Sequence, residues 1–204
     1  METLLESFVR SPKLVLYNRH VRALLSDERR RRKQFYDDIT EQQKAEFING
    51  EIIVHSPVKL EHEFASNNLN VLLKTYVMLH KIGYVGHEKM MISLTRNDYE
   101  PDVCFWSSKK SVKFKPKQMK FPAPDFIAEV LSPATRDIDR TVKLEDYEAH
   151  GVKEYWIIDP DKQIIEQYIN EKQTFELHQK FVTSGILQSV VIEGFEIEIS
   201  DLFV

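Results

Sequence analysis

Two acidic residues and one lysine occupy positions that are unusual for their charge. Glu129 interrupts the apolar run Phe126–Leu131, and Asp102 follows Pro101 at the start of an apolar segment 27 residues earlier (129 − 102). Lys143 follows the glutamate by 14 residues (143 − 129). Burying an unpaired carboxylate costs on the order of several kcal/mol, so such a group is protonated, paired or metal-bound. These three residues are therefore candidates for a catalytic site.

The chemistry that this set favours is phosphodiester hydrolysis. Two carboxylates on strands can share a hard divalent cation such as Mg²⁺, which prefers oxygen ligands and keeps several waters. Such an ion polarises a phosphoryl oxygen and lowers the pKa of a bound water, while a lysine positions that water or offsets developing charge. We expect Asp102 and Glu129 to be the metal ligands and Lys143 the third catalytic residue, with Mn²⁺ able to replace Mg²⁺.

A strand, a helix and a second strand must position these residues. The apolar run Phe126–Leu131 predicts a buried strand that ends before Pro133, because proline lacks a backbone donor and restricts its predecessor. A helix is expected over 138–150, with Gly151 as its stop, followed by a strand over 154–158. Short connections between these elements predict a crossover unit with at least one parallel pair of strands.

The periodicity of these elements predicts which side chains meet. On the helix, Asp139, Lys143 and Tyr147 lie at i, i+4 and i+8, which is a single stripe. If this stripe packs over the strand face that carries Glu129, the lysine ammonium reaches the glutamate carboxylate. These residues alone leave an alternative open, in which Asp139 and Lys143 form an ordinary surface pair and Glu129 is satisfied at the sheet edge.

The rest of the chain predicts an α/β fold with a central mixed sheet flanked by helices and with extra C-terminal strands. Asn49-Gly50 between apolar runs predicts a type I′ hairpin over 46–54. An amphipathic helix is expected over 60–81, buried through residues that include Phe64 and Leu79, with Gly83 as its stop. Residues 1–45 are expected to form a helical extension packed on a core of residues 46–204. Further strands are expected at 84–94, 99–106, 164–169, 174–181 and 190–199. The strands 164–169 and 174–181 are expected to pair as a hairpin across Asn170-Glu171.

Two basic segments could contact phosphates. Arg29–Lys33 is a run of five cations beside aromatic residues, and the expected loop 107–121 is rich in lysine. Basic residues of this kind can bind nucleic-acid backbones, although such runs are more often solvated surface charge, particularly where acids are interleaved. The candidates for nucleic-acid contacts are Arg30, Arg31, Arg32, Lys33, Lys109 and Lys110.

Composition places the chain among ordinary globular proteins. It has 204 residues, 42% hydrophobic and 29% charged, and a net charge of −4, which argues against a surface that is basic throughout. The single cysteine, Cys104, excludes an internal disulfide and fits a reducing compartment. The start METLLESFVR does not resemble a signal peptide, and no apolar run approaches the length of a membrane span. We expect a soluble, cytoplasmic protein without membrane contact.

The ordered set of motifs resembles the Uma2 family (DUF820), a branch of the PD-(D/E)XK restriction-endonuclease-like superfamily. The resemblance extends over about residues 46–170. It is carried by EFINGE at 46–51, Ser56-Pro57 with His62, Glu100-Pro101-Asp102, DFIAEVLSP at 125–133, Thr135-Arg136, Asp139, Lys143, Tyr147, Gly151-Val152 and EYWIIDP at 154–160.

The resemblance implies roles for individual residues. Asp102 matches the metal-binding aspartate of the superfamily, and Glu129 matches its acidic partner on the next strand. The superfamily usually has a lysine two residues after that acid, where this chain has Leu131, and in this branch Lys143 on the helix matches instead. Residues that match supporting positions are Glu46, His62, Asp125, Asp139 and Tyr147.

The function expected from residues and resemblance together is a Mg²⁺-dependent endonuclease acting on DNA. A homodimer suits this activity, because cutting both strands of a duplex fits two-fold symmetry. Two alternatives stay open. One is a catalytically weak nucleic-acid-binding or regulatory module on the same fold. The other is a structural homodimer in which Asp102, Glu129 and Lys143 form a buried ion-pair network.

Overall fold

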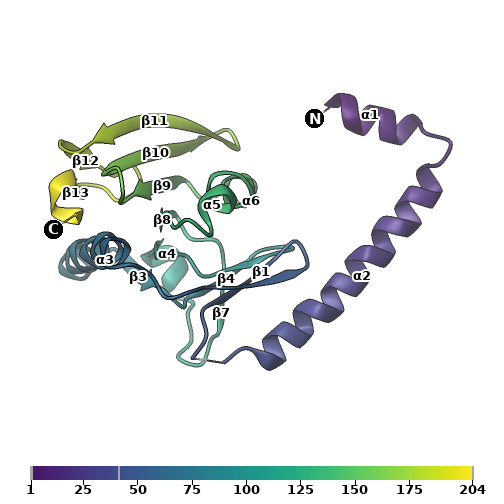
Figure 1. Ribbon diagram of the computed structural model, residues 1–204, viewed down its shortest axis with the longest axis horizontal. Helices are drawn as coiled ribbons and strands as arrows, with labels where there is room; N and C mark the ends of the chain where they lie inside the picture. Colours follow the sequence, from purple (N-terminus) through teal and green to yellow (C-terminus); the bar gives the residue numbers. More distant parts are fainter. Residues whose placement is uncertain (1, 41, 204) are drawn as a thin grey trace.

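A six-stranded mixed sheet forms the centre of the molecule (Figure 1). The computed structural model describes residues 2–40 and 42–203, so the predicted extension 1–45 is described except at Met1 and Glu41, and Val204 also lies outside the described residues. The strand order is β11-β10-β9-β8-β6-β3. In that order the strands are Thr174–Val182, Ile164–Glu171, Glu154–Asp159, Phe126–Val130, Val103–Ser107 and Gly83–His87.

The predicted crossover unit is confirmed. β8 and β9 are parallel, with Glu129 opposite Ile157, and the other neighbouring pairs in this sheet are antiparallel. The connection is not the single helix expected over 138–150. It consists of α5 (Arg136–Arg140) and α6 (Val142–Ala149), because Thr141 leaves helical geometry with φ −127° and ψ −82°.

A second, five-stranded sheet has the order β2-β1-β5-β4-β7. The predicted hairpin is confirmed as β1 and β2, and positive φ at Asn49 (51°) and Gly50 (87°) is what a type I′ turn requires. In the order of the sheet the strands are Glu51–Val54, Ala45–Ile48, Asp98–Tyr99, Met91–Ser93 and Lys120–Phe121.

Two stretches expected as single strands are divided between the two sheets. The segment 84–94 forms β3 and β4, separated at Glu88, whose left-handed φ of 56° turns the chain. The segment 99–106 forms β5 and β6, and Pro101 between them cannot donate to a strand ladder. This division places Asp102 where the chain passes from one sheet to the other.

The predicted long helix is confirmed as α3 (Leu60–His80), which lies along the six-stranded sheet. Its buried face differs from the one expected, since Phe64 is 40% exposed and Leu79 75% exposed. Its buried apolar side chains are instead Ala65, Leu69, Leu73 and Val77. The helix ends at Lys81 in left-handed geometry, and Gly83 lies in β3.

The two faces of β8 belong to different hydrophobic clusters, as strand alternation predicts. Phe126, Ala128 and Val130 pack in the cluster that contains the buried face of α3. Ile127 and Leu131 pack in the cluster that contains Tyr147 of α6. Glu129 therefore faces the α6 side of the sheet.

The C-terminal hairpin is confirmed as β10 and β11, with its turn at Lys172 and Gln173 rather than at Asn170-Glu171. The single strand expected over 190–199 is wrong. Residues Glu196–Glu198 form β13, which pairs with β12 (Ile186–Gln188), and Ile199–Leu202 forms the short helix η1. The expected loop 107–121 also contains α4 (Ser108–Ser111) and β7.

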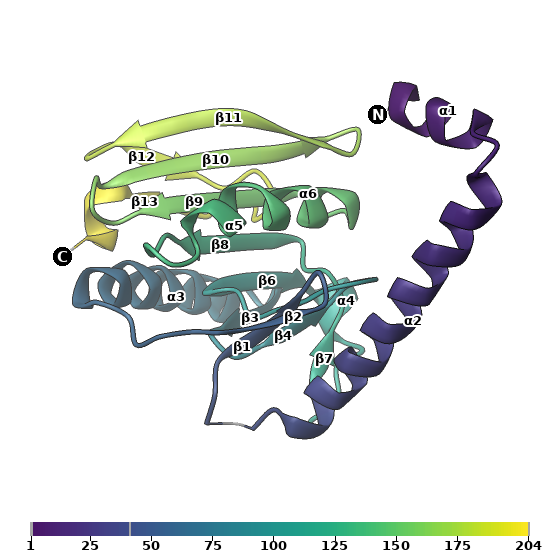
Figure 2. The ribbon, with the colours of Figure 1, turned by 45° about the vertical axis from the view of Figure 1, so that its right-hand side comes forward.

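Two N-terminal helices project from the body of the molecule (Figure 2). They are α1 (Glu2–Arg10) and α2 (Leu14–Asp38). The second half of α2 is attached to the core through buried Phe35 and through Arg32, which binds Asp98. Among the helices of the described residues, none is long and apolar enough to cross a membrane.

Candidate active site

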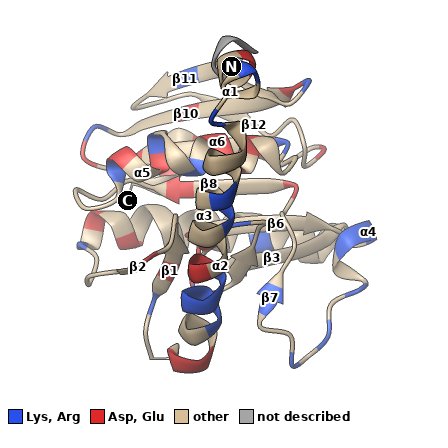
Figure 3. Cartoon of the chain, turned by 90° about the vertical axis from the view of Figure 1, so that its right-hand side faces the viewer, with Lys and Arg blue, Asp and Glu red and all other residues tan. Residues whose placement is uncertain are grey.

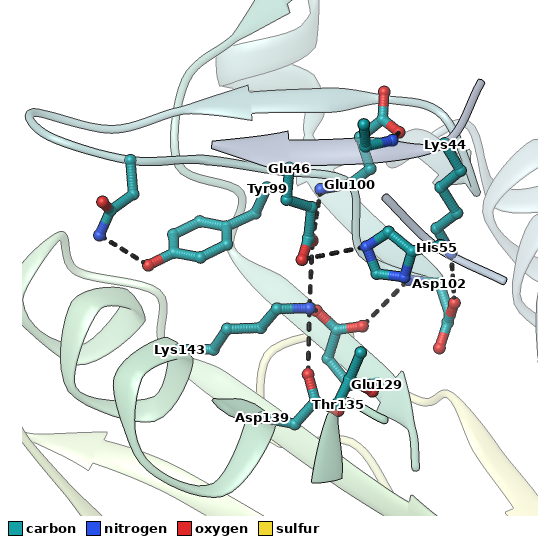
Figure 4. Close-up of polar contacts among 12 residues, drawn as sticks. Lys44, Glu46, His55, Tyr99, Glu100, Asp102, Glu129, Thr135, Asp139 and Lys143 are labelled. Carbon is teal, nitrogen blue, oxygen red and sulfur yellow. Dashed lines mark hydrogen bonds and ion pairs between the residues drawn. The ribbon is translucent and has the colours of Figure 1, made fainter. Parts of the chain in front are cut away.

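A cavity of about 610 Å³ lies where the chain enters β6 and leaves β8. Its walls come from the segment after β2, the first turn of α3, Glu88-Lys89 and the chain that follows β8. Asp102, Glu129 and Lys143 all line it. The structure thus brings together the three predicted catalytic residues in one cavity (Figure 4).

Asp102 immediately precedes β6 and is hydrogen-bonded to β8. Its Oδ2 accepts a hydrogen bond from Val130 N at 2.9 Å and lies 3.4 Å from His62 Nε2, while its Oδ1 accepts from Lys44 Nζ at 2.7 Å. Burial alone would raise the pKa of Asp102, but His62 and Lys44 outweigh it and hold this pKa well below its usual range. Asp102 is therefore ionised in the folded protein.

Glu129 lies beside Asp102 and has the opposite electrostatic character. Its Oε2 accepts a hydrogen bond from Asp102 N at 3.3 Å, and its Oε1 accepts from Lys143 Nζ at 2.9 Å and from Tyr147 Oη at 3.0 Å. Burial raises the pKa of Glu129 to about 8, because desolvation and the neighbouring acids together exceed the attraction of Lys143. The two carboxyl groups are thus adjacent, but the pKa of Asp102 is lowered and that of Glu129 is raised.

Lys143 is the centre of a buried group of acids. Its Nζ lies 2.9 Å from Glu129 Oε1, 3.1 Å from Glu46 Oε1 and 3.0 Å from Asp139 Oδ1. Only 2% of its side chain is exposed. Although burial opposes a charged ammonium, these carboxylates keep the pKa of Lys143 well above its usual value. The alternative of a surface Asp139–Lys143 pair is wrong, since both side chains are buried.

Glu46 joins the hairpin to this group. Its Oε1 accepts a hydrogen bond from Glu100 N at 2.8 Å, and its Oε2 lies 3.2 Å from His55 Nε2. Burial would raise the pKa of Glu46, but Lys143 and His55 overcome it and lower this pKa to about 2. Glu46 is therefore ionised and, together with Asp139 and Glu129, stabilises the charge of Lys143.

Lys44 and Glu88 belong to the site, although the sequence analysis did not select them. Lys44 Nζ bridges Asp102 Oδ1 at 2.7 Å and Glu88 Oε2 at 2.8 Å. A signal for Lys44 was present, because residues two apart in an extended segment share a face and Glu46 had been selected. Glu100 was also missed. Burial raises its pKa to about 7.

The supporting residues divide into two groups. His62, Glu46, Asp139 and Tyr147 contact members of the cluster directly. Asp125 lies at the other end of β8, where it accepts a hydrogen bond from Ser107 N at 2.9 Å and pairs with Lys110 at 3.1 Å. The structure therefore separates Asp125 from the other candidates.

The basic segments lie outside the cavity walls. Figure 3 shows their cations along α2 and near α4 and β7. Arg32 is engaged in hydrogen bonds within the protein, since its guanidinium binds both Asp98 oxygens and the carbonyls of Leu94 and Asn97. Arg31 binds Gly50 O, and Lys110 binds Ala123 O at 2.9 Å. Arg30, Lys33 and Lys109 remain exposed on the surface.

The donor set fits a small divalent cation. Within the described ranges 2–40 and 42–203, no three His, Cys, Asp or Glu side chains are arranged to hold a metal ion by themselves. Mg²⁺ needs no such cage, because it is held by one or two carboxylates and keeps several waters. Asp102 and Glu129 supply two such carboxylates in the cavity wall, and an ammonium, Lys44 Nζ, already lies against one of them.

Comparison with known proteins identifies a solved structure of the same fold. A search of curated proteins gives no match. The chain is similar to a solved structure from Anabaena variabilis, described as "a putative nuclease belonging to DUF820". The TM-score is 0.72 and the sequence identity is 20%. The match covers 84% of this chain and 96% of that one. The two proteins share a fold, and the predicted mixed sheet flanked by helices is confirmed.

The family follows from a longer sequence match. The family model Uma2, described as "Putative restriction endonuclease", matches residues 32–200, which is most of the chain. The chain belongs to the Uma2 family. The restriction-endonuclease-like family generally uses divalent metals, in agreement with the donor chemistry of the cavity.

Proposed function

We propose that this protein is a Mg²⁺-dependent endonuclease that hydrolyses phosphodiester bonds of DNA, with Asp102 and Glu129 as its metal ligands. The observation that supports this most strongly is the pair of carboxyl groups from β6 and β8 in one cavity wall, where Asp102 N lies 3.3 Å from Glu129 Oε2. Membership of the Uma2 family points to the same chemistry.

The reaction requires no oxidant or reductant. The oxygen of a water forms a bond to phosphorus while one P–O ester bond breaks, and the products are a phosphomonoester and a sugar hydroxyl. The proton that the water loses balances the proton that the departing sugar oxygen gains. A bound divalent cation supplies a water of lowered pKa and neutralises charge on the phosphoryl group.

The side chains around the two ligands set their geometry. Lys143 and Tyr147 both donate to Glu129 Oε1, which fixes the rotamer of that carboxyl group and leaves its Oε2 beside Asp102. Val130 N holds Asp102 Oδ2 in the same way. Such supporting hydrogen bonds orient metal ligands, and their loss typically lowers metal affinity or activity about 10–100-fold.

The direct test is nicking of supercoiled plasmid by the purified protein with Mg²⁺, with Mn²⁺ and with EDTA. We expect relaxed and linear DNA with either metal and none with EDTA. Intact plasmid with both metals would contradict a nuclease acting on DNA. DNA binding without nicking would favour the nucleic-acid-binding module.

Glu129→Gln separates the enzyme from a purely structural ion-pair network. We expect loss of metal-dependent nicking, because the amide cannot supply an anionic ligand. We also compare the free energies of unfolding of the two proteins in EDTA. We expect the value for the variant, minus that for wild type, to increase from pH 5 to pH 8. The folded-state pKa of about 8 exceeds that of the unfolded chain, so wild type loses stability as pH rises through this window, and glutamine does not.

Urea denaturation at the two pH values measures the stability difference, and plasmid nicking measures the activity. Tyr147→Phe is the matched control, since it removes one hydrogen bond to Glu129 and keeps the carboxyl group. A Glu129→Gln protein that nicks at the wild-type rate would show that the cluster is structural only.

We also propose that the protein forms a homodimer through its N-terminal helices. Large apolar side chains are exposed on α1 and on the first half of α2, including Leu5, Val15, Leu16, Val21 and Leu24. Burying these side chains against a second copy would stabilise the dimer by about 25 cal/mol per Å² of apolar surface removed from water. Sedimentation velocity of wild type and of Val21→Glu/Leu24→Glu tests this, and a monomeric wild type would refute it.

A further inference from the structure

Two lysines that line the cavity differ in their exposure and in the number of acids around them. An ammonium group has three N–H donors. The Nζ of Lys143 lies 2.9–3.1 Å from three buried carboxyl groups, those of Glu46, Glu129 and Asp139, and donates a hydrogen bond to Glu129 Oε1. Lys143 is therefore enclosed by buried acids, and only 2% of its side chain is exposed for contact with a phosphate.

Lys44 is more exposed than Lys143 and has fewer acidic partners. Within the part of the chain that the structure describes, its Nζ has two partners, Asp102 at 2.7 Å and Glu88 at 2.8 Å, so one N–H remains. Its side chain is 15% exposed and lines the cavity, whereas that of Lys143 is 2% exposed. Figure 4 shows Lys44 reaching Asp102 on the opposite side from Lys143.

We propose that Lys44 is the catalytic lysine that contacts the phosphate of the substrate, and that Lys143 is a positioning residue that holds Glu129 and Glu46. This inference rests on the proposed nuclease function. Lys44 donates its remaining N–H to a non-bridging phosphoryl oxygen and stays charged, so no proton is transferred to or from it. Its partners Asp102 and Glu88 keep the pKa of Lys44 above its usual value in spite of burial.

The position of Lys44 suits this role. It pairs directly with Asp102, the ionised ligand candidate, so its ammonium would lie beside a cation held by Asp102 and could contact the phosphate whose charge that cation would neutralise. A charge placed against the phosphoryl oxygens of a phosphodiester acts most strongly in a site shielded from water. Asp102 and His62 next to it are both buried.

The test compares Lys44→Met with Lys143→Met and with Lys180→Met, a lysine on β11 that pairs with buried Glu166 at 2.8 Å. Duplex binding is measured by fluorescence anisotropy over a range of salt, with Ca²⁺ replacing Mg²⁺ and with a gel to verify that the duplex stays intact. One lost phosphate contact lowers the slope of log K against log salt by about 0.9. We expect this loss in Lys44→Met and not in the other two.

Single-turnover cleavage and Mn²⁺ titration complete the comparison. We expect Lys44→Met to cleave about 10²-fold more slowly or worse, as for removal of one charge-stabilising donor. Its Mn²⁺ affinity should not fall, because the ammonium competes with the metal for Asp102. Lys44→Arg should recover part of the rate. If Lys44→Met does not fold, Lys44→Gln provides the same comparison with an uncharged donor on Asp102.

The outcomes distinguish this inference from the proposed function. Wild type that cleaves, together with a Lys44→Met protein of unchanged rate and unchanged salt slope, overturns the role of Lys44 alone. A Lys44→Met protein that loses Mn²⁺ affinity along with rate assigns Lys44 to the metal site, which also overturns it. Wild type that neither binds Mn²⁺ nor cleaves overturns the nuclease and the role of Lys44 together.

Discussion

Asp102→Asn is expected to lower the rate of metal-dependent DNA cleavage by about 10³-fold or more while leaving the fold intact. The substitution keeps the shape of the side chain and an oxygen that can accept from Val130 N, but it removes the anionic charge. A metal ion supplies several kcal/mol of transition-state stabilisation, and each ~1.4 kcal/mol corresponds to a factor of ten in rate. Single-turnover cleavage of a labelled duplex measures the loss.

The matched control is Asp146→Asn. Asp146 accepts hydrogen bonds from Asn97 and Tyr99 at 2.7 and 2.8 Å, so it is also a carboxylate engaged by the protein, but it does not line the cavity. We expect this variant to cleave at the wild-type rate. A folded Asp102→Asn protein with a rate within threefold of wild type would remove Asp102 from the site.

Lys143→Met is expected to destabilise the protein by about 3–5 kcal/mol, the usual cost of removing one partner from a buried ion pair. Its Nζ lies within 3.1 Å of three buried carboxyl groups, so methionine leaves the ionised Glu46 without its lysine partner. Because native proteins are stable by about 5–15 kcal/mol, the variant should still fold at low temperature. Urea denaturation gives the free energy of unfolding.

A double variant tests the assigned cause. In Lys143→Met/Glu46→Gln the uncompensated charge is removed, and we expect the double variant to be more stable than Lys143→Met. Such a coupling identifies a direct interaction between the two side chains. Additive losses in the double variant would show that Lys143 stabilises the fold through packing of its aliphatic chain instead.

The convergence of the site was predictable because periodicity fixes which side chains share a face. Strand alternation predicted that Glu129 shares a face with Ile127 and Leu131, and helical spacing predicted one stripe for Lys143 and Tyr147, while whether the two met was left open. Both predictions held although Thr141 divides the helix into α5 and α6, because Asp139 on α5 still reaches Lys143 Nζ at 3.0 Å. No proline or glycine marks that break, so local sequence could not reveal it.

Other features depend on tertiary structure that local patterns do not encode. Which apolar residues of α3 are buried is decided by the sheet beneath, since Ala65 packs in the cluster with that sheet while Leu79 is 75% exposed. The two-sheet division at Glu88 and Pro101 depends on pairings between distant segments. Lys44 was missed because the hairpin prediction began at Glu46, and its importance appears only once Asp102 and Glu88 lie beside it.

The most direct test of the central claim is isothermal titration of Mn²⁺ into wild type, Asp102→Asn and Asp146→Asn at pH 8.5, where Glu129 with its pKa of about 8 is largely ionised. We predict saturable binding to wild type and to Asp146→Asn, and its loss in Asp102→Asn. Binding of equal affinity in all three proteins, or no binding to wild type, would contradict a metal site at Asp102 and Glu129.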